Sequence, residues 1–559
     1  MPWCYGAAIH VSGDLGGSGY APPMAQDLQR RIQAVTLLLA ASSLLSRLLG
    51  YGRDWLINYQ FGATGLTDAY QASFTIPDML NYLLAGGALT TTLLPRMSTL
   101  LRQEQVATEQ GTALPEFRDS DRVFSLVFTC VGVITVGLVL VGEVAATPLI
   151  RLWCTGFSAD KIALTAHLTR IILPAQLFFV LGGLIQATLL ARQSFRAMAL
   201  TPLLYNGGII AGGLLGGKTF GIEGFSWGAL VGAALGALAI PLWSARGHLR
   251  FRPLWAPNDK EFRAFLWTAL PLMIGVSLTT VDEWLGRRYG SRLAPGSISW
   301  LANARRVMLV PIGLIGSAAS QATGAFIAQL FARGQRDELA QVLTQAVSGV
   351  VALSVLVSGL LYVLAGPIVE NLFQYGHFSS DDARRVAELL QPLSLGIAAW
   401  SAQQVLARGF FSTGDSWRPM LLTTALTVAI VPLYAISAEH FGILGLAWSA
   451  TIGMTCQAVA VGILAHRRLG LVVPTLASAV WRSLVVALLA AAVAGWVLMQ
   501  CQTRLGDLGL GVHQQRVTQL VLSGTAWFVV VLAVGIPLRV PGLHGVADRF
   551  RRRFVKLRK

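Results

Sequence analysis

The feature that most constrains the fold of this chain is an internal repeat with an offset of about 220 residues. Residues 148–160 read PLIRLWCTGFSAD and residues 367–381 read PIVENLFQYGHFSSD, so proline, glycine, phenylalanine, serine and aspartate recur in the same order. Further along, FGIEGFSW at residues 220–227 returns as FGILGLAW at residues 441–448. Two copies of one ancestral half explain these matches better than chance, and internal repeats are typical of secondary transporters.

The composition places most of this chain in a lipid bilayer. Hydrophobic residues make up 54% of the sequence and charged residues only 13%, whereas soluble domains carry roughly 25% charged residues. A helix needs about 20 apolar residues to cross a hydrocarbon core of ~30 Å. We therefore predict an all-α polytopic membrane protein with about 14 transmembrane helices. The predicted stretches lie at residues 34–52, 68–94, 122–148, 164–190, 199–217, 222–244, 264–286, 297–326, 341–366, 385–411, 419–437, 442–465, 476–500 and 517–538.

The repeat divides these stretches into two lobes of six helices each, followed by two additional helices. Because an offset of six spans preserves orientation, we expect the lobes to be related by a pseudo-two-fold axis along the membrane normal. The expected organisation is a disordered N-terminal tail at residues 1–29, an N-terminal lobe at 30–252, a C-terminal lobe at 253–470, two additional transmembrane helices at 471–540 and a basic cytoplasmic tail at 541–559.

Lysine and arginine are concentrated in alternate loops, and such residues are retained on the cytoplasmic side of short loops. Arg30 precedes the first stretch and residues 549–559 are strongly basic, so both termini are predicted to be cytoplasmic. Arg287, Arg288 and Arg292 are an exception, because they fall at the expected outer mouth between the seventh and eighth stretches. The net charge of +16 is spread over short loops and the tail, which favours contact with anionic lipid over nucleic acid.

Polar and charged residues follow one face of several apolar stretches. At the end of the first stretch, Arg47 and Gly50, and Asp54 two residues beyond it, recur at spacings of three and four residues, as on one side of a helix. Charged residues inside the membrane cost roughly 2.5 to 3.5 kcal/mol each on insertion scales, so they are retained mainly where they face water or a partner. We therefore predict an aqueous cavity between the lobes, lined by the first two helices of each half. Candidate lining residues in the other three of these helices are Asp78, Asn81, Tyr82, Asp282 and Asn303.

Two simpler explanations stay open for parts of this pattern. Glycine and serine on a helix face also mark tight packing, as small residues do in any membrane bundle. Asp54 and Asp282 can each serve only to neutralise a neighbouring arginine, and this structural role has the same weight as a role in substrate binding.

The sequence shows no pattern of a known type of active site. It lacks a glycine-rich phosphate loop, a metal-binding spacing among its eight histidines and a nucleophile elbow. We therefore expect no enzymatic activity, no cofactor and no bound metal. Without a nucleotide-binding motif, transport has to be driven by an ion gradient, the membrane potential or the gradient of the substrate itself.

Seven short motifs stand out along the chain: SRLLG at residues 46–50, RD at 53–54, FGA at 61–63, TDAY at 67–70, GSISW at 296–300, ARR at 304–306 and LFQYG at 372–376. Taken together they resemble the MviN/MurJ family of lipid II flippases, and the resemblance covers roughly residues 34–470. It implies the fold of the multidrug/oligosaccharidyl-lipid/polysaccharide exporter superfamily, in which two six-helix lobes surround a central V-shaped cavity.

The resemblance also implies a function. The expected activity is alternating-access transport of an undecaprenyl-diphosphate-linked saccharide, foremost the peptidoglycan precursor lipid II, from the inner to the outer leaflet of the bacterial inner membrane. The implied partners are this lipid-linked saccharide, membrane lipids and proteins of cell-wall synthesis, with no nucleic acid. In the family, cavity arginines are thought to engage the diphosphate. The substrate-binding positions carried over from the matching motifs are Arg47, Arg53, Asp54, Asp68 and Arg306.

The chain departs from the family pattern in its second stretch. The family usually carries two arginines and then a glutamate after its Ile/Leu-Pro-Asn motif, whereas this chain has Asn81 and Tyr82, and Asp78 adds a negative charge. We therefore expect a less cationic cavity with a weaker or differently placed diphosphate contact. The eleventh stretch, residues 419–437, has no carboxylate, which weakens any transfer of a sodium site to the C-terminal lobe.

This departure keeps other functions open. One is a flippase for an exopolysaccharide or O-antigen lipid, and another is an ion-coupled multidrug or cation antiporter of the same superfamily. A membrane scaffold that kept the fold without transport is a third.

Overall fold

The computed structural model describes residues 23–543 except 85–87, 114, 248, 275–277 and 505–510. All regular secondary structure in this part of the chain is helical, so the prediction of an all-α fold is confirmed. Within it, nine continuous helical segments are long and apolar enough to cross a membrane. The elements are α1 Pro23–Phe61, α2 Gly65–Ser73, α3 Thr75–Leu84, α4 Ala88–Glu109, α5 Asp119–Trp153, α6 Ala159–Ile172, α7 Ala175–Ala191, α8 Arg196–Phe220, α9 Glu223–Ala233, η1 Ala234–Ala239, α10 Ile240–Ala245, α11 Lys260–Ile274, α12 Leu278–Gly290, α13 Ser297–Pro311, η2 Ile312–Gly316, α14 Ser317–Ala332, α15 Arg336–Val363, α16 Ala365–Phe373, α17 Ser380–Leu395, α18 Ile397–Ser412, α19 Trp417–Leu469, α20 Val473–Arg504 and α21 Val512–Gly535.

Several of the predicted membrane stretches consist of two or three helices in line. The second contains α2, α3 and α4, and the eighth contains α13, the π-helix η2 and α14. α19 contains both the eleventh and the twelfth stretch as two helices, and a sharp turn of the backbone at Gly442 separates them. The described helices are therefore consistent with the fourteen predicted crossings. α1 begins at Pro23, inside the predicted tail of residues 1–29, whereas residues 1–22 and most of the predicted basic tail lie outside the described residues.

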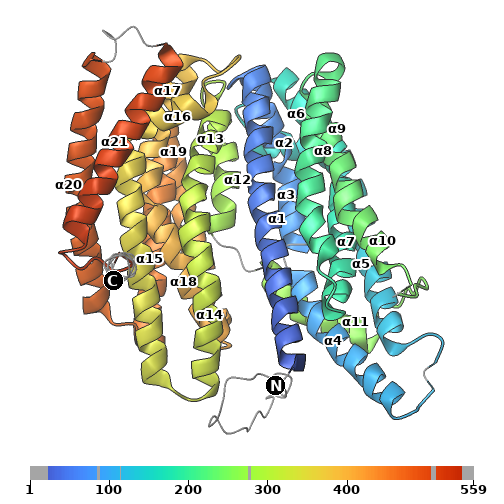
Figure 1. The fold of residues 1–559 in the computed structure, drawn as a ribbon. Helices are drawn as coiled ribbons and strands as arrows, with labels where there is room; N and C mark the ends of the chain where they lie inside the picture. Colours follow the sequence, from blue (N-terminus) through green and yellow to red (C-terminus); the bar gives the residue numbers. More distant parts are fainter. Residues whose placement is uncertain are drawn as a thin grey trace.

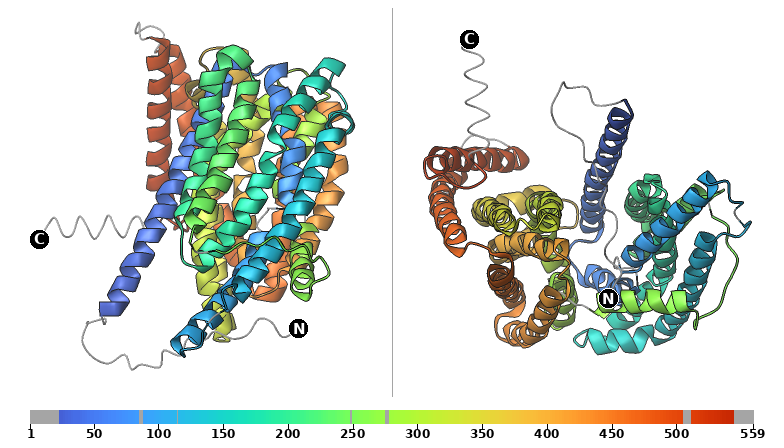
Figure 2. Two further views of the ribbon diagram at one scale, coloured as in Figure 1. Left: turned by 90° about the vertical axis from the view of Figure 1, so that its right-hand side faces the viewer. Right: turned by 90° about the horizontal axis from the view of Figure 1, so that it is seen from below.

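The helices form two lobes that lie side by side (Figure 1, Figure 2). The N-terminal lobe contains α1 to α10, and the C-terminal lobe contains α12 to α19. The two last helices, α20 and α21, pack on α15 at the face of the C-terminal lobe that points away from the N-terminal lobe. These three helices share one buried apolar cluster, to which Leu356, Val486 and Trp527 each contribute a side chain.

Helix α11 packs on the N-terminal lobe, although its sequence lies in the predicted C-terminal lobe. It follows the predicted lobe boundary at residue 252, yet it packs on α3, α4 and α5 of the N-terminal lobe. Phe262 and Met273 of α11 are buried in one apolar cluster with Leu93 and Phe124 of that lobe. The view from below in Figure 2 shows α11 crossing these helices. The chain therefore passes from one lobe to the other within the seventh predicted stretch, between α11 and α12.

The internal repeat is visible in the backbone geometry. Gly221 and Gly442 form the two corresponding hairpin turns, with φ 58° and ψ −133° in the first and φ 59° and ψ −139° in the second. Only glycine adopts this region of positive φ at little cost. Ser158 and Ser379 cap α6 and α17, since each side-chain oxygen accepts a hydrogen bond from the backbone N–H three residues later. The residues that repeat in the sequence are thus those that begin and turn the helices.

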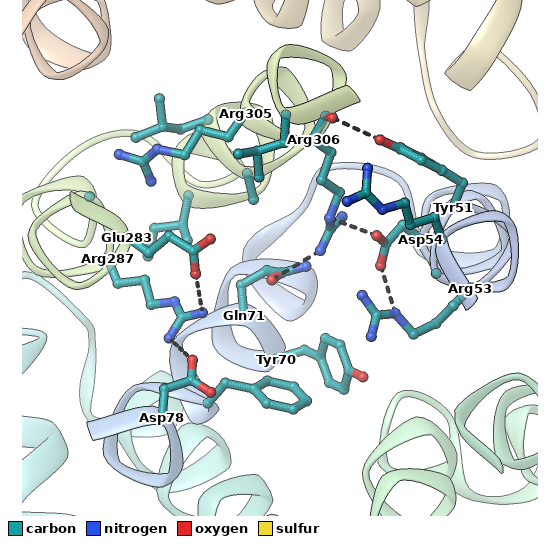
Figure 3. Close-up of a pocket in the computed structure, with 18 of the residues that line it drawn as sticks. Tyr51, Arg53, Asp54, Tyr70, Gln71, Asp78, Glu283, Arg287, Arg305 and Arg306 are labelled. Carbon is teal, nitrogen blue, oxygen red and sulfur yellow. Dashed lines mark hydrogen bonds and ion pairs between the residues drawn. The ribbon is translucent and has the colours of Figure 1, made fainter. Parts of the chain in front are cut away.

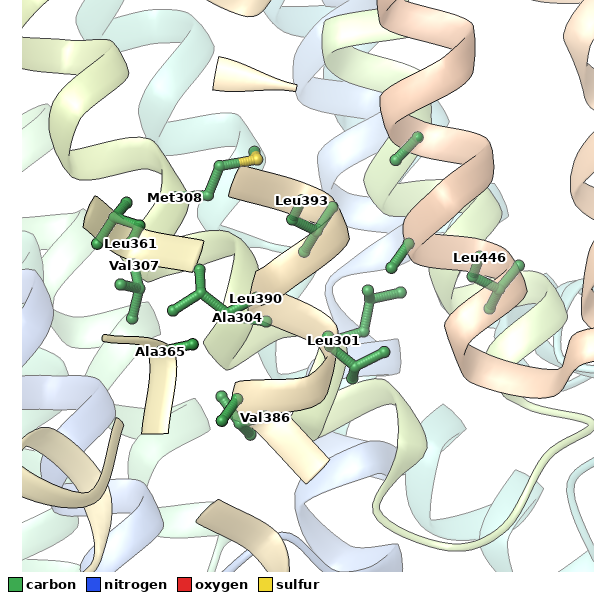
Figure 4. Packing of buried hydrophobic residues seen from close by; sticks show 14 of the residues in the cluster. Leu301, Ala304, Val307, Met308, Leu361, Ala365, Val386, Leu390, Leu393 and Leu446 are labelled. Carbon is green, nitrogen blue, oxygen red and sulfur yellow. The ribbon is translucent and has the colours of Figure 1, made fainter. Parts of the chain in front are cut away.

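The core of the C-terminal lobe holds α13 in place. Leu301, Ala304 and Met308 of α13 are buried in an apolar cluster with Leu390 of α17 and Leu446 of α19 (Figure 4). In a membrane such contacts stabilise mainly through close packing, because lipid tails are as apolar as leucine. This packing fixes one side of α13, and the other side faces the N-terminal lobe.

Candidate functional site

A cavity of about 440 Å³ lies between the two lobes. Its walls come from α1, α2, α3 and α8 of the N-terminal lobe and from α12 and α13 of the C-terminal lobe. Five arginines and three carboxylates line it, which leaves a net charge of +2 when all are ionised. These side chains are Arg47, Arg53, Arg287, Arg305, Arg306, Asp54, Asp78 and Glu283.

Asp54 is the centre of the first charged group in this cavity (Figure 3). Its carboxylate accepts a hydrogen bond from Nε of Arg53 at 2.9 Å and forms an ion pair with Arg306, whose Nε lies 2.7 Å from the second carboxylate oxygen. Arg306 also donates to the side-chain oxygen of Asn303 at 3.2 Å. Because Arg306 lies on α13, Asp54 joins the two lobes. The group has a net charge of +1, so it can bind an anion by charge-assisted hydrogen bonds without losing its internal pairing.

Arg47 is the cavity cation that is free to receive a ligand. Among the described residues it has no hydrogen bond and no ion pair, and its side chain is exposed. The guanidinium lies against Gly313 of η2, where a β-carbon would come within 2.1 Å of Nη1. Glycine at position 313 therefore leaves the space that Arg47 occupies. A free guanidinium of this kind suits a phosphate oxygen, because its planar fork offers two parallel donors.

A second charged group lies on the opposite side of the cavity, with Gln71 between the two (Figure 3). Arg287 of α12 donates from Nη1 to Asp78 of α3 at 2.7 Å and from Nη2 to Glu283 at 3.4 Å. Arg287, predicted to lie in a loop between two stretches, belongs to α12, which continues to Gly290 and carries Arg287 in the cavity wall. A spacing of four residues between Glu283 and Arg287 is a helical ion-pair signal that would have indicated this position.

Asp68, a predicted substrate contact, is not part of the cavity wall. Its buried carboxylate accepts hydrogen bonds from the backbone N–H groups of Gly296 at 2.7 Å and Ser299 at 2.9 Å, at the start of α13 in the other lobe. Lys161 of the same lobe lies 3.3 Å away. Asp68 therefore connects the lobes beyond one end of the cavity.

Other contacts between the lobes lie close to Asp68 in the sequence. Asn58 and Asn303 exchange two side-chain hydrogen bonds of 2.9 and 3.1 Å. The backbone N–H of His377 donates to the carbonyl oxygen of Tyr59 at 3.0 Å. We call these contacts, together with those of Asp68 to Gly296 and Ser299, the interlobe seam. Asn303, a candidate lining residue, thus belongs to the seam.

Asp282 is buried inside the C-terminal lobe rather than exposed to the cavity. Nε of Arg305 lies 2.7 Å from its carboxylate, and the hydroxyl of Tyr434 donates to it as well. Of the two roles left open for Asp282, these contacts support the structural one, because a buried carboxylate is tolerated only when it is paired and hydrogen-bonded.

Asn81 and Tyr82, which replace the arginines usual in the resembling family, also lie outside the cavity wall. The amide of Asn81 donates to Gln176 at 2.8 Å. The ring of Tyr82 packs edge-to-face on Trp284 at 5.8 Å between ring centroids. The cation beside Asp78 comes instead from Arg287 of the other lobe. The expected loss of cavity cations is therefore partly offset by a residue on α12.

Two helical lobes around a charged interlobe cavity, in a chain with many membrane-crossing helices, define a multi-pass membrane transporter. A family model described as lipid II flippase MurJ matches residues 57–513. The chain therefore belongs to the MurJ family.

Comparison with individual proteins agrees with this assignment. A probable lipid II flippase MurJ of Bdellovibrio bacteriovorus is 27% identical over 439 residues, which cover 77% of this chain and 81% of that protein. The solved structure of lipid II flippase MurJ in an inward closed conformation aligns with a TM-score of 0.72 at 20% identity, over 88% of this chain and 98% of that one. A multidrug resistance MATE family transporter in an inward-facing conformation aligns with a TM-score of 0.61 at 16% identity, over 76% and 94%. At these identities the two structural likenesses concern the fold alone.

Proposed function

We propose that this chain is a flippase that moves lipid II from the inner to the outer leaflet of the bacterial inner membrane. The observation that carries this proposal is the interlobe cavity with its net charge of +2 and with Arg47, which has no ion-pair partner in the described part of the chain. A diphosphate headgroup does not cross hydrocarbon unaided, because its charges would lose their hydration. Arg47, Arg53 and Arg306 replace that hydration with charge-assisted hydrogen bonds, while the lipid tail stays in the bilayer.

The contacts between the lobes support transport by alternating access. Here the interlobe seam holds the lobes together at one end of the cavity. For cargo to leave on that side, the seam has to separate while the lobes approach each other at the other end. Such rigid-body rocking of two halves around a central site is common among transporters built from repeats.

The charge of the cavity favours this cargo over cationic drugs. All three carboxylates that the described residues contribute to its walls are paired with arginine, so a cation entering the cavity meets no free carboxylate among them. Lipid-linked exopolysaccharide and O-antigen units carry a diphosphate as well. The choice of lipid II among these lipids is supported by membership in the MurJ family.

Complementation tests this proposal directly. Cells depleted of their own lipid II flippase should regain growth when they express this chain. A variant that lacks both Arg47 and Arg306 should not restore growth at equal membrane level. Failure of the wild-type chain, despite correct insertion and folding, would contradict lipid II as the cargo.

We also propose that the chain acts without covalent chemistry, that its termini are cytoplasmic and that proteins of cell-wall synthesis are its neighbours. The distribution of arginine and lysine in the loops supports the orientation. Cell-wall enzymes that consume lipid II in the outer leaflet would benefit from proximity to the protein that delivers it.

The orientation has its own prediction. Cysteines introduced at Gly65 and Ser380, at the starts of α2 and α17, should react with a membrane-impermeant thiol reagent added outside the cell. A cysteine at Ala332, at the end of α14, should react only after the membrane is opened. Ala332 is a better labelling site than the neighbouring Gly334, because the φ of +74° at Gly334 would strain any side chain. Labelling in the reverse pattern would overturn the orientation.

A further inference from the structure

Arg287 joins the two lobes from within the cavity. It lies on α12 of the C-terminal lobe, and its Nη1 donates to Asp78 on α3 of the N-terminal lobe at 2.7 Å. Glu283, one turn earlier on α12, accepts from Nη2 at 3.4 Å. The Arg287 side chain is only 11% exposed, whereas those of Asp78 and Glu283 are 40% and 49% exposed. The cation is thus held in the wall, and its two carboxylate partners face the open space.

The charges of the cavity are unequally distributed. Asp54 with its two arginines, together with Arg47, forms a cationic side at α1 and α13. Arg287 with two carboxylates forms a group with a net charge of −1 at α3 and α12. Both groups line one cavity of about 440 Å³, so a headgroup that reaches the cationic side also comes close to Asp78. The negative charge it brings repels Asp78 and attracts Arg287.

We propose that Arg287 is a further contact for the diphosphate, and that the headgroup takes this guanidinium from Asp78. This inference depends on the proposed function and adds to it a binding residue on α12. In the exchange, Nη1 of Arg287 stops donating to the Asp78 carboxylate and donates to a phosphate oxygen. Nη2 keeps its contact with Glu283, which lies on the same helix and holds the guanidinium at the cavity surface.

The exchange links cargo binding to the separation of the lobes. A ligand shifts a conformational equilibrium only by its difference in affinity for the two states. The Asp78–Arg287 pair crosses from one lobe to the other, so it favours the conformation in which the lobes touch here. A headgroup that breaks this ion pair removes one contact that opposes separation of the lobes. The loaded protein therefore opens more readily than the empty one.

Two variants that remove the same interlobe pair provide the test. Asp78→Asn leaves Arg287 charged and free for cargo, whereas Arg287→Gln removes the cation. Any effect of the lost pair on the balance of conformations has the same sign in both variants, so a difference in their affinities reports direct contact with cargo. With fluorescently labelled lipid II and protein in nanodiscs, we expect Asp78→Asn to bind more tightly than wild type and Arg287→Gln more weakly. Their affinities should differ on the order of tenfold or more.

Opening of the seam is measured in the same samples. Ser299 is buried in the seam, so a cysteine at this position should react slowly with a thiol reagent until the lobes separate. Labelling, read by mass spectrometry of the peptide that carries it, should be accelerated by lipid II in the wild-type background. In Asp78→Asn and Arg287→Gln it should be faster without cargo, and cargo should add less.

Two further variants serve as matched controls. Glu283→Gln removes a contact within α12 and no interlobe pair, so it should not accelerate the labelling of Ser299→Cys. Arg384→Gln removes an exposed arginine paired with Asp381 inside one lobe, and it should change neither quantity.

The outcomes separate this inference from the proposed function. If folded wild-type protein binds lipid II but Asp78→Asn and Arg287→Gln bind it equally well, the pair is only structural and the inference is overturned, while the proposed function stands. If folded wild-type protein binds no lipid II, the proposed function is overturned, and the inference with it.

Discussion

Replacing Arg306 with alanine is expected to abolish the growth of flippase-depleted cells that depend on this chain, while the protein still inserts and folds. The variant loses a cavity cation and the bridge from α13 to Asp54. Asp54 keeps Arg53 at 2.9 Å, so no carboxylate is left unpaired. Insertion should even become easier, because an arginine inside a membrane costs roughly 2.5 to 3.5 kcal/mol.

The size of the effect can be measured as a change in affinity for lipid II. A hydrogen bond to a charged group contributes about 1.5 to 3 kcal/mol, so the affinity of Arg306→Ala for labelled lipid II should fall by about ten- to a hundredfold. Arg306→Lys should also be impaired. Lysine keeps the charge but lacks the planar fork that lets one side chain meet Asp54 and a phosphate oxygen together. Arg384→Ala, at an exposed position on α17, is the matched control. Wild-type growth and affinity in Arg306→Ala would remove this residue from the site.

Features of the fold that depend on local sequence were predictable. Gly221 and Gly442 recur because both hairpins need a residue with positive φ. Arg47 and Asp54 lie in the cavity wall, as predicted, because charged residues at helical spacing in an apolar stretch have to face water or a partner. These arguments need no knowledge of how distant helices pack.

Features that depend on the packing of distant helices were not predictable. One residue corresponds to a rotation of about 100° around a helix. The predicted stripe on the seventh stretch put Asp282 in the cavity, whereas the wall is formed by its neighbour Glu283 and by Arg287. Asp282 turns instead to Arg305 and Tyr434, which lie on α13 and α19. Nothing in the local sequence around Asp282 distinguishes a face that meets Tyr434 from a face that meets water.

The packing of α11 has the same cause. Its amphipathic sequence is compatible with either lobe, and the choice depends on Leu93 and Phe124, which precede it by more than a hundred residues. The boundary at residue 252 was placed from the sequence repeat, which does not reveal the packing of a helix. α11 packs instead on α3, α4 and α5 of the N-terminal lobe.

Asp68 is expected to act on the seam rather than on the cargo. Asp68→Ala removes the acceptor of two backbone N–H groups, those of Gly296 and Ser299, and leaves Lys161 without its carboxylate. Two hydrogen bonds to a charged acceptor contribute together about 3 kcal/mol or more, so the population with an open seam should rise by about a hundredfold. Transport should fall strongly, because the protein no longer keeps the seam closed while it binds its cargo.

A pair of variants separates this role from substrate binding. In Asp68→Ala, labelling of Ser299→Cys should accelerate strongly, whereas Lys161→Met, which keeps both bonds across the seam, should have little effect. Arg47→Ala should show the opposite behaviour, with lower affinity for lipid II and unchanged labelling, because Arg47 lines the cavity and forms no pair across the lobes among the described residues. If Asp68→Ala instead lowered the affinity tenfold and left the labelling unchanged, Asp68 would be a contact of the headgroup. The remaining hydrogen bonds of Asn58, Asn303 and Tyr59 would then hold the seam closed. The headgroup would reach Asp68 by displacing the start of α13, whose backbone N–H groups now donate to this carboxylate.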